Sequence, residues 1–311
     1  MKIIMTGASS FTGFWFVREL AAAGHDVTAV FRKPADAYTD EIRRERVRLI
    51  SGVCRPVHGC EFGDPSFLGL IDEGRWDLLC HHAADVTNYK SPDFDVITAL
   101  DNNTSNLVPV LRALASAGCG KVLLTGSVFE GGEGSGSEGL PDFSPYGLSK
   151  SLTAQLFRYH CGQLGFGLGK FVIPNPFGPY EEARFTAYLI RSWMKGDTPT
   201  CSTPRYVRDN IHVSLLAKGY AQFARNLGGP GFSRLNPSGY AETQEAFALR
   251  VARELEPRLN RPCPIHFKRQ VDFPEPRVRI NTQPLEADLS DWQESEAWDD
   301  LASYYQRQGQ S

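Results

Sequence analysis

Residues 2–13 read KIIMTGASSFTG: a short apolar strand runs into a Gly/Ser turn and then into a helical pattern that we expect to begin near Phe14. Glycines at 7 and 13 would let a phosphate approach backbone N–H groups, and a helix N-terminus attracts negative charge. The stretch therefore predicts the first strand, turn and helix of a dinucleotide-binding unit. The alternative is a tight turn that only packs the helix against the strand.

Strand-like and helical runs then alternate along the first half of the chain. The runs are FTGFWFVRELAAAG (11–24), HDVTAVFR (25–32), WDLLCHHAA (76–84), NNTSNLVPVLRALASAG (102–118), KVLLTGS (121–127) and GKFVIPN (169–175). This alternation predicts an α/β fold with a doubly wound parallel (Rossmann) sheet of six or seven strands over residues 1–173, joined by a return segment at about 207–235. The Pro- and Arg-rich remainder, 174–206 and 236–311, predicts a smaller C-terminal substrate-binding lobe.

The composition is typical of a soluble globular protein without a polyelectrolyte partner. The 311 residues are 41% hydrophobic and 22% charged, with a formal net charge of -3, so we expect no nucleic-acid partner. The N-terminus carries no long apolar region, so we expect a cytoplasmic protein without a membrane partner. The seven cysteines have no paired spacing and predict reduced thiols. CRPVHGC (54–60) lacks a second ligand pair, so no metal site is predicted.

The second predicted strand ends VTAVFRKP, with Arg32 and Lys33 at its tip and no acid there. A carboxylate at this point binds the ribose 2′-hydroxyl of NAD, whereas an arginine accommodates the 2′-phosphate of NADP. The tip therefore favours NADP over NAD. The alternative is that both cations are solvated surface residues.

SPYGLSKSLTAQLFRYH (144–160) predicts a helix in which Ser144 caps the N-terminus and Pro145 occupies the first turn. Tyr146 and Lys150 are four residues apart and share one face. An ammonium group near a phenol favours the phenolate, which makes the pair a candidate acid/base for a hydroxyl or carbonyl group. On its own, such a pair is more often a surface contact.

These patterns occur together and in one order. They are TGASSFTG from residue 6, HHAA at 81–84, NNT at 102–104, the strand that ends in Thr125, YGLSK at 146–150, PNPFGP at 174–179 and RDNIHV at 208–213. The set resembles the extended short-chain dehydrogenase/reductase family, whose members act mostly on nucleotide sugars. The resemblance runs from Met1 to at least Asn226, and more loosely to the end of the chain. It implies that Tyr146 is the catalytic acid/base, that Lys150 binds the nicotinamide ribose, and that Thr125 polarises the sugar oxygen.

The resemblance also implies two sets of binding residues. Ser10 stands where the family usually has glycine, so the pyrophosphate would sit differently or accept a hydrogen bond from the serine. Simpler alternatives stay open for three positions: a solvated acid at Glu61, a helix cap at Asn103, and a salt bridge between Arg208 and Asp209. The expected cofactor-binding residues are Gly7, Ser10, Phe11, Thr12, Gly13, Arg32, Lys33, Glu61, Phe62, His82, Ala83, Ala84, Asn103, Tyr146 and Lys150; the expected substrate-binding residues are Ser127, Asn175, Arg208 and Arg277.

The residues after Thr125 reduce the number of reactions that fit the family resemblance. The family's dehydratases have an acid next to this hydroxyl, and its 3,5-epimerising reductases have a cysteine two residues on, whereas this chain has Gly126 and Ser127. We interpret Glu130 as a solvated carboxylate at the mouth of a glycine-rich loop (130–145), which forms either a lid or a surface connection. Reduction of a 4-keto sugar nucleotide is the first hypothesis and nucleotide-sugar 4-epimerisation the second. A catalytically silent NAD(P)-binding sensor or scaffold is the third.

The resemblance also suggests a homodimer. The helices after Asn103 and after Tyr146 would form the contact between the two copies. Their apolar faces would serve equally well as internal core, and the sequence leaves this alternative open.

Overall fold

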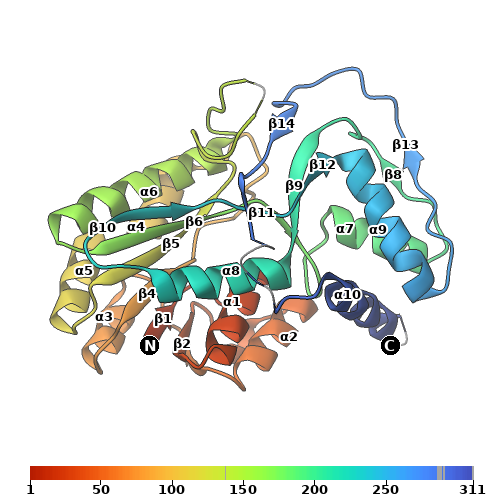
Figure 1. Ribbon diagram of the computed structural model, residues 1–311. Helices are drawn as coiled ribbons and strands as arrows, with labels where there is room; N and C mark the ends of the chain where they lie inside the picture. The colour runs from red at the N-terminus through yellow and green to blue at the C-terminus, as the bar shows by residue number, and fades with distance from the viewer. Residues whose placement is uncertain (137, 286–288, 290, 310–311) are drawn as a thin grey trace. The chain divides into compact units, whose positions relative to one another are not determined.

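The computed structural model describes residues 1–136, 138–285, 289 and 291–309. The chain divides into two compact units, each with its own core (Figure 1). Unit 1 comprises Met1–Glu133, Pro141–Ile173 and Ala217–Asn236, and unit 2 comprises Gly134–Leu140, Pro174–Leu216 and Pro237–Ser311. The segment 207–235, expected to return to the first domain, is divided between them, because its first strand pairs with strands of unit 2.

Unit 1 contains a seven-stranded parallel sheet in the order β10-β6-β5-β4-β1-β2-β3, which confirms the predicted Rossmann-like architecture. Because the strands are parallel, their carboxyl ends meet at one edge, where ligands of such sheets bind. The strands are β1 (Lys2–Met5), β2 (Asp26–Phe31), β3 (Arg55–His58), β4 (Leu78–His81), β5 (Lys121–Ser127), β6 (Gly167–Ile173) and β10 (Gly231–Leu235).

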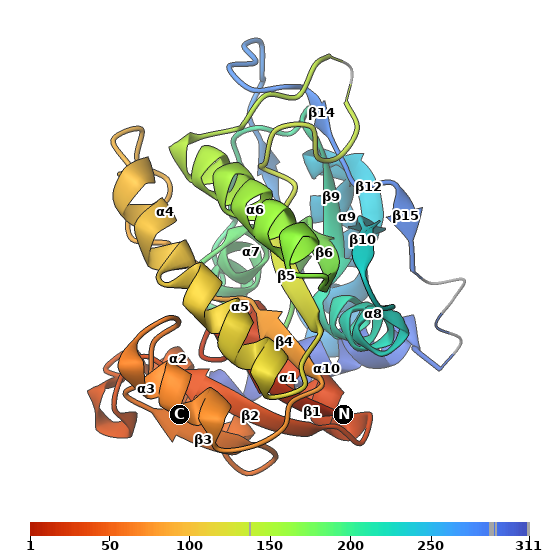
Figure 2. The ribbon, with the colours of Figure 1, turned by 90° about the vertical axis from the view of Figure 1, so that its left-hand side faces the viewer.

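Helices cover both faces of this sheet. On one face α3, α5 and α6 bury a continuous apolar cluster, and Figure 2 shows α5 and α6 crossing that face. On the other face Phe16 of α1 stacks on Tyr220 of α8, with ring centroids 3.9 Å apart. The helices are α1 (Phe11–Ala22), α2 (Glu41–Ile50), α3 (Pro65–Asp72), α4 (Val96–Thr104), α5 (Leu107–Ser116), α6 (Pro145–Gln163) and α8 (Val213–Asn226), with a 3-10 turn η1 (Ala35–Ala37).

The described part of unit 2 is built from short strands and the helices α7, α9 and α10 around a separate core that includes Phe177, Trp193 and Trp298. Its largest sheet is centred on β9, which pairs in parallel with β7 and β14 and antiparallel with β12. The elements are β7 (Asn175–Phe177), α7 (Phe185–Met194), β8 (Thr200–Cys201), β9 (Val207–His212), β11 (Pro237–Ser238), β12 (Tyr240–Thr243), α9 (Gln244–Leu259), β13 (His266–Phe267), β14 (Val278–Arg279), β15 (Gln283–Pro284) and α10 (Glu294–Gln308).

Candidate active site

The packing of the turn after β1 requires glycine at two positions. Gly7 has a φ of +72°, and a Cβ atom there would lie 2.7 Å from the backbone nitrogen of Ala83. A Cβ atom on Gly13 would lie 2.2 Å from the carbonyl oxygen of Gly7. The fold therefore explains both glycines without a ligand. Ser10 caps α1 by accepting a hydrogen bond from the Gly13 N–H (3.1 Å), and the helix consequently begins at Phe11 rather than near Phe14.

His82, which follows β4, joins this turn to the end of β5. Its Nε2 lies 2.9 Å from Ser10 Oγ and 3.0 Å from Thr12 Oγ1, and its Nδ1 lies 2.9 Å from Thr125 Oγ1. Ser10 donates its hydroxyl proton to the Gly7 carbonyl (2.9 Å), so we assign the His82 proton to Nε2. Nδ1 then accepts from Thr125, and the Thr125 hydroxyl proton is committed to this bond.

Burial and the nearby charge of Lys150 lower the pKa of His82 to about 3. The ring is therefore neutral at ordinary pH, in agreement with a single ring proton. The serine hydroxyl, expected as a possible donor to a pyrophosphate, donates within the turn instead.

Tyr146 and Lys150 occupy the first turns of α6, which begins as the sequence predicts. Ser144 Oγ accepts from the Gly147 N–H (3.2 Å), and Pro145 stands in the first turn. The buried Lys150 Nζ donates to the Thr125 carbonyl oxygen (2.7 Å), while the half-buried Tyr146 ring packs edge-on against Tyr89 and Phe94. Burial lowers the pKa of Lys150 to about 8. The amine of Lys150 therefore titrates close to physiological pH, unlike an exposed lysine.

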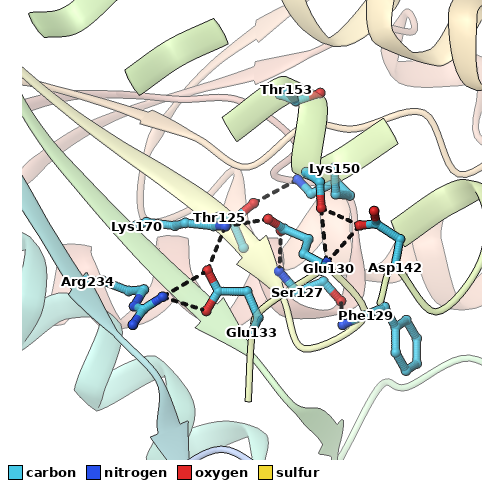
Figure 3. Close-up of polar contacts among 12 residues, drawn as sticks. Thr125, Ser127, Phe129, Glu130, Glu133, Asp142, Lys150, Thr153, Lys170 and Arg234 are labelled. Carbon is cyan, nitrogen blue, oxygen red and sulfur yellow. Dashed lines mark hydrogen bonds and ion pairs between the residues drawn. The ribbon is translucent and has the colours of Figure 1, made fainter. Parts of the chain in front are cut away.

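Glu130 is fully buried, so our interpretation of it as a solvated loop carboxylate was wrong. Its Oε1 accepts from the Ser127 N–H (2.7 Å) and its Oε2 pairs with Lys170 Nζ, as Figure 3 shows. Ser127 lies on the same face of β5 as Thr125, and its Oγ accepts from the Phe129 N–H (3.2 Å). The carboxylate of Glu130 therefore binds the backbone at the end of β5 and does not point into solvent.

The glycine-rich segment 130–145 is held at both ends. The Gly131 N–H donates to Asp142 Oδ1 (2.7 Å), which also accepts from Ser151 of α6. The Phe143 N–H donates to the Phe129 carbonyl (2.9 Å), and Glu133 is buried. Ser137, within the expected loop, lies outside the described residues. These contacts fix the ends of the segment beside β5 and α6.

At the tip of β2, Arg32 pairs with Glu61 at 3.6 Å, and both side chains are largely exposed. The backbone carbonyl of Lys33 contacts His58 Nδ1 at 3.3 Å. The side chain of Phe62, another expected cofactor-binding residue, packs in the core against His81 and Phe67. Two residues predicted to bind the dinucleotide, Arg32 and Glu61, thus neutralise each other in part.

Asn103 lies in α4 and makes contacts in three directions. Its Nδ2 donates to Thr153 Oγ1 of α6 (3.2 Å), its Oδ1 accepts from the Asp85 N–H (2.8 Å), and its carbonyl lies 3.1 Å from His81 Nε2. It therefore ties α6 to the segment after β4 and does not cap a helix. In that segment the Ala83 N–H donates to Thr6 Oγ1 (3.1 Å), and Ala84 follows half-buried; Phe11 is buried in the first turn of α1.

The predicted substrate residues of unit 2 are bound to neighbours within that unit. Asn175 Nδ2 donates to the Asp209 carbonyl (3.1 Å). Arg208 pairs with Glu275 (2.8 Å) and not with Asp209, whose buried carboxylate accepts from the Gly239 and Asn281 N–H groups, so the predicted alternative for Arg208 was wrong. The exposed Arg277 guanidinium lies 4.6 Å from the centre of the Phe273 ring.

Unit 2 also has a pocket of about 410 Å³ that the sequence did not suggest. None of Asn175, Arg208 and Arg277 lines it. Its lining combines two aromatic rings, hydroxyl and amide groups and one cation: Phe185, Tyr188, Thr200, Ser202, Thr203, Gln244 and Lys268.

The two thiols of CRPVHGC lie in surroundings that disfavour the thiolate. Burial raises the pKa of Cys54 to about 11 and also raises that of Cys60, which keeps both thiols protonated. Across the described part of the chain, no group of three or more His, Cys, Asp or Glu side chains is arranged to hold a metal ion. Within the same residues, no helix is long and apolar enough to span a membrane.

Comparisons with known proteins agree on the fold. A model of the NAD dependent epimerase/dehydratase family matches residues 3–232. No curated protein matches the sequence. Among solved structures, the UDP-glucuronic acid 4-epimerase of Bacillus cereus with UDP-glucuronic acid and NAD is similar, with a TM-score of 0.72 at 16% identity over 99% of this chain and 100% of that one. The UDP-glucose 4-epimerase of Thermus thermophilus with NAD has a TM-score of 0.72 at 20% identity over 98% and 99%. The dTDP-glucose 4,6-dehydratase of Streptomyces venezuelae has a TM-score of 0.70 at 16% identity over 99% and 97%.

Proposed function

The chain belongs to the NAD dependent epimerase/dehydratase family, and from this premise we propose that it is a nucleotide-sugar 4-epimerase that works through a transient 4-keto sugar. The observation that carries the proposal is the end of β5, where Thr125 and Ser127 supply two hydroxyls, Lys150 binds the Thr125 carbonyl, and the carboxylate of Glu130 is already bound to the Ser127 N–H and Lys170. Elimination of water needs a second acid or base next to the hydroxyl. Glu130 is buried and paired with Lys170, so it does not supply one.

The residues proposed to hold a nicotinamide dinucleotide surround the carboxyl end of the sheet. The N-terminus of α1 and the turn from Gly7 to Gly13 suit a pyrophosphate, and the Lys150 ammonium suits a ribose. A nicotinamide bound there would supply reversible hydride transfer at the sugar carbon. The chain's own residues would orient the sugar and move one proton.

Tyr146 is proposed to take the proton from the sugar hydroxyl and return it, and Lys150 to stabilise the phenolate. Thr125 was our first candidate for the hydroxyl that donates to the sugar oxygen. With the tautomer assigned above, the Thr125 hydroxyl donates to His82, whereas among the described residues the Ser127 hydroxyl is bonded to the Phe129 N–H, which leaves its proton for a ligand. We therefore assign this role to Ser127 and a supporting role to Thr125.

NADP was the first expectation for the cofactor, from Arg32 and Lys33. The contact between Arg32 and Glu61 reduces the charge available to a 2′-phosphate, which supports NAD at least equally. Reduction of a 4-keto sugar nucleotide with NADPH remains the second candidate, because Arg32 is still largely exposed.

One experiment separates these functions. The purified protein is incubated with UDP-glucose, UDP-glucuronic acid or UDP-N-acetylglucosamine and NAD, and the 4-epimers are followed by NMR. A 4-epimer without net cofactor turnover supports the epimerase. Oxidation of NADPH by a 4-keto sugar nucleotide, with no epimer formed, would favour the reductase. Cofactor binding without turnover on either panel would indicate a silent sensor or scaffold.

Three variants test the residue roles in whichever assay succeeds. Tyr146→Phe should lower kcat by about 10² to 10⁴-fold while cofactor binding persists. Ser127→Ala should lower kcat by about 10² to 10³-fold, as for the loss of a donor to a developing oxyanion. Thr125→Val should cost less than Ser127→Ala, and the reverse order would return the donor role to Thr125.

A further inference from the structure

Lys170 is a buried cation in the middle of an otherwise apolar strand, GLGKFVI (β6). Its ammonium pairs with Glu130 and lies 2.9 Å from Glu133 Oε1 (Figure 3). Glu133 also accepts from Asn236 (2.9 Å) and pairs with Arg234 at 3.4 Å. Buried charges carry a large desolvation cost, so a network of this kind in a core needs a reason.

Gly126 makes room for the pair of Lys170 and Glu130. A Cβ atom at this position would lie 2.7 Å from Lys170 Cε and 3.0 Å from Glu130 Oε1. The backbone of β5 is thus contacted by charged groups at two points: Lys150 binds the Thr125 carbonyl, and Glu130 binds the Ser127 N–H two residues further on. The charge pair therefore lies against the strand segment that carries both hydroxyls of the proposed site, on the face of Gly126.

The charged and titratable groups around Lys150 come from several elements. Glu130 and Glu133 follow β5, Lys170 lies on β6, and His81 and His82 lie at the end of β4. Burial and the charge of Lys150 lower the pKa of each histidine to about 3, so both are neutral. Tyr146 lies on the same helix, and Asp142 is bound to Ser151. Of these charged groups, Glu130 and Lys170 act on the Lys150 ammonium.

We propose that Glu130 and Lys170 are positioning residues that fix the end of β5 and set, with opposite signs, how readily Lys150 keeps its proton. The proposal rests on the proposed function in one respect, the binding of a dinucleotide ribose by Lys150. Glu130 stabilises the ammonium form, and Lys170 favours the neutral amine. The pair therefore lets a buried lysine carry its charge at neutral pH and release its proton in mildly alkaline solution.

The direction of the pKa at Lys150 agrees with this geometry. Burial lowers this pKa to about 8, the charge of Glu130 raises it, and the charge of Lys170 lowers it further. Removing the charge of Glu130 should therefore lower the pKa of Lys150, and removing the charge of Lys170 should raise it. A purely structural role would make the two variants behave alike, because each of them breaks the same ion pair.

The test measures the dissociation constants of NADH and NADPH by fluorescence between pH 6.5 and 10. For the native chain we expect affinity to fall above about pH 8 as Lys150 loses its proton. Glu130→Gln should move this midpoint down by about one pH unit and Lys170→Met should move it up by about one. The double variant should return close to the native midpoint. Glu73→Gln, which breaks the exposed pair with Arg55, is the matched control and should leave the midpoint unchanged.

Shifts in the same direction, or no shift in either variant, would overturn the inference while leaving the proposed function intact. If the native chain binds neither dinucleotide, the proposed function fails. The inference is then decided by the alkaline pH at which the stability against urea begins to rise. This pH should be lower in Glu130→Gln than in the native chain and higher in Lys170→Met. If Lys170→Met does not fold, Glu130→Gln and the double variant still decide it: the first must shift the midpoint down and the second must restore it.

Discussion

Replacing Lys150 by methionine should change how the stability of the protein depends on alkaline pH. The pKa of this amine falls from 10.5 to about 8 on folding, mainly through burial. Between these values the folded chain binds fewer protons than the unfolded chain, so stability rises with pH across this window. At about 1.4 kcal/mol per pH unit, the rise due to this one group is about 3 kcal/mol.

Lys150→Met removes that titration. At pH 7 the variant avoids the cost of the buried charge but leaves the Thr125 carbonyl without its donor, which costs about 1–3 kcal/mol. The two effects nearly cancel, so stability at pH 7 alone decides little. The useful quantity is the difference in stability between native chain and variant, which should shift by about 3 kcal/mol in favour of the native chain from pH 7 to 10.5.

The assay is urea unfolding followed by circular dichroism at half-unit steps of pH. Lys33→Met, at an exposed position, is the control and should give a curve parallel to that of the native chain. Parallel curves for Lys150→Met as well would refute the reasoning. They would mean that Lys150 titrates at the same pH in the folded and unfolded chains.

Three further outcomes follow from the structure. Gly126→Ala should lower the free energy of unfolding in urea by about 1–3 kcal/mol, because its Cβ would press on the buried Lys170 and Glu130. The control Gly69→Ala in α3, where a Cβ meets no atom within 4 Å, should be neutral or stabilising, and equal effects of the two variants would contradict this account. Burial lowers the pKa values of His81, His82 and His212 to about 3. As the pH is lowered from 6.5, the free energy of unfolding should therefore decrease by up to about 1.4 kcal/mol per pH unit for each ring. Equal urea midpoints at pH 7 and pH 5 would contradict this expectation. Thr243→Ala, which removes the side-chain cap of α9, should cost about 1 kcal/mol, and an unchanged midpoint would show that the cap is dispensable.

The features that the sequence predicted well are local ones. The alternation of strand and helix patterns gave the sheet of unit 1, and Ser144 and Pro145 gave the start of α6. Each depends on residues a few positions apart, where periodicity and capping act directly. Ser10 also belongs to this class, but we interpreted it through the resemblance and not as a cap. The helix it begins was therefore placed too late.

The features that the sequence could not give depend on distant partners. Glu130 looked solvated because glycines and serines follow it, yet its partner is 40 positions away on the neighbouring strand. The same holds for Arg208, where the adjacent Asp209 was the obvious partner and Glu275 is the actual one. One signal was available: a lysine inside an apolar strand needs an acid somewhere, and the sequence alone does not say which.

Gly126, Glu130 and Lys170 are best understood as one unit. A side chain at Gly126 would press on the ion pair, loss of Lys170 would take from the buried Glu130 its ion-pair partner, and loss of Glu130 would leave Lys170 with its second partner, Glu133. A change at any one of these three residues therefore disturbs the contacts of the other two. A single substitution consequently cannot convert Glu130 into an acid available for elimination. Glu130 is tied to the backbone of Ser127, the hydroxyl proposed here to assist hydride transfer. In the proposed mechanism this bond, more than the missing acid after Thr125, keeps Glu130 from serving in an elimination of water.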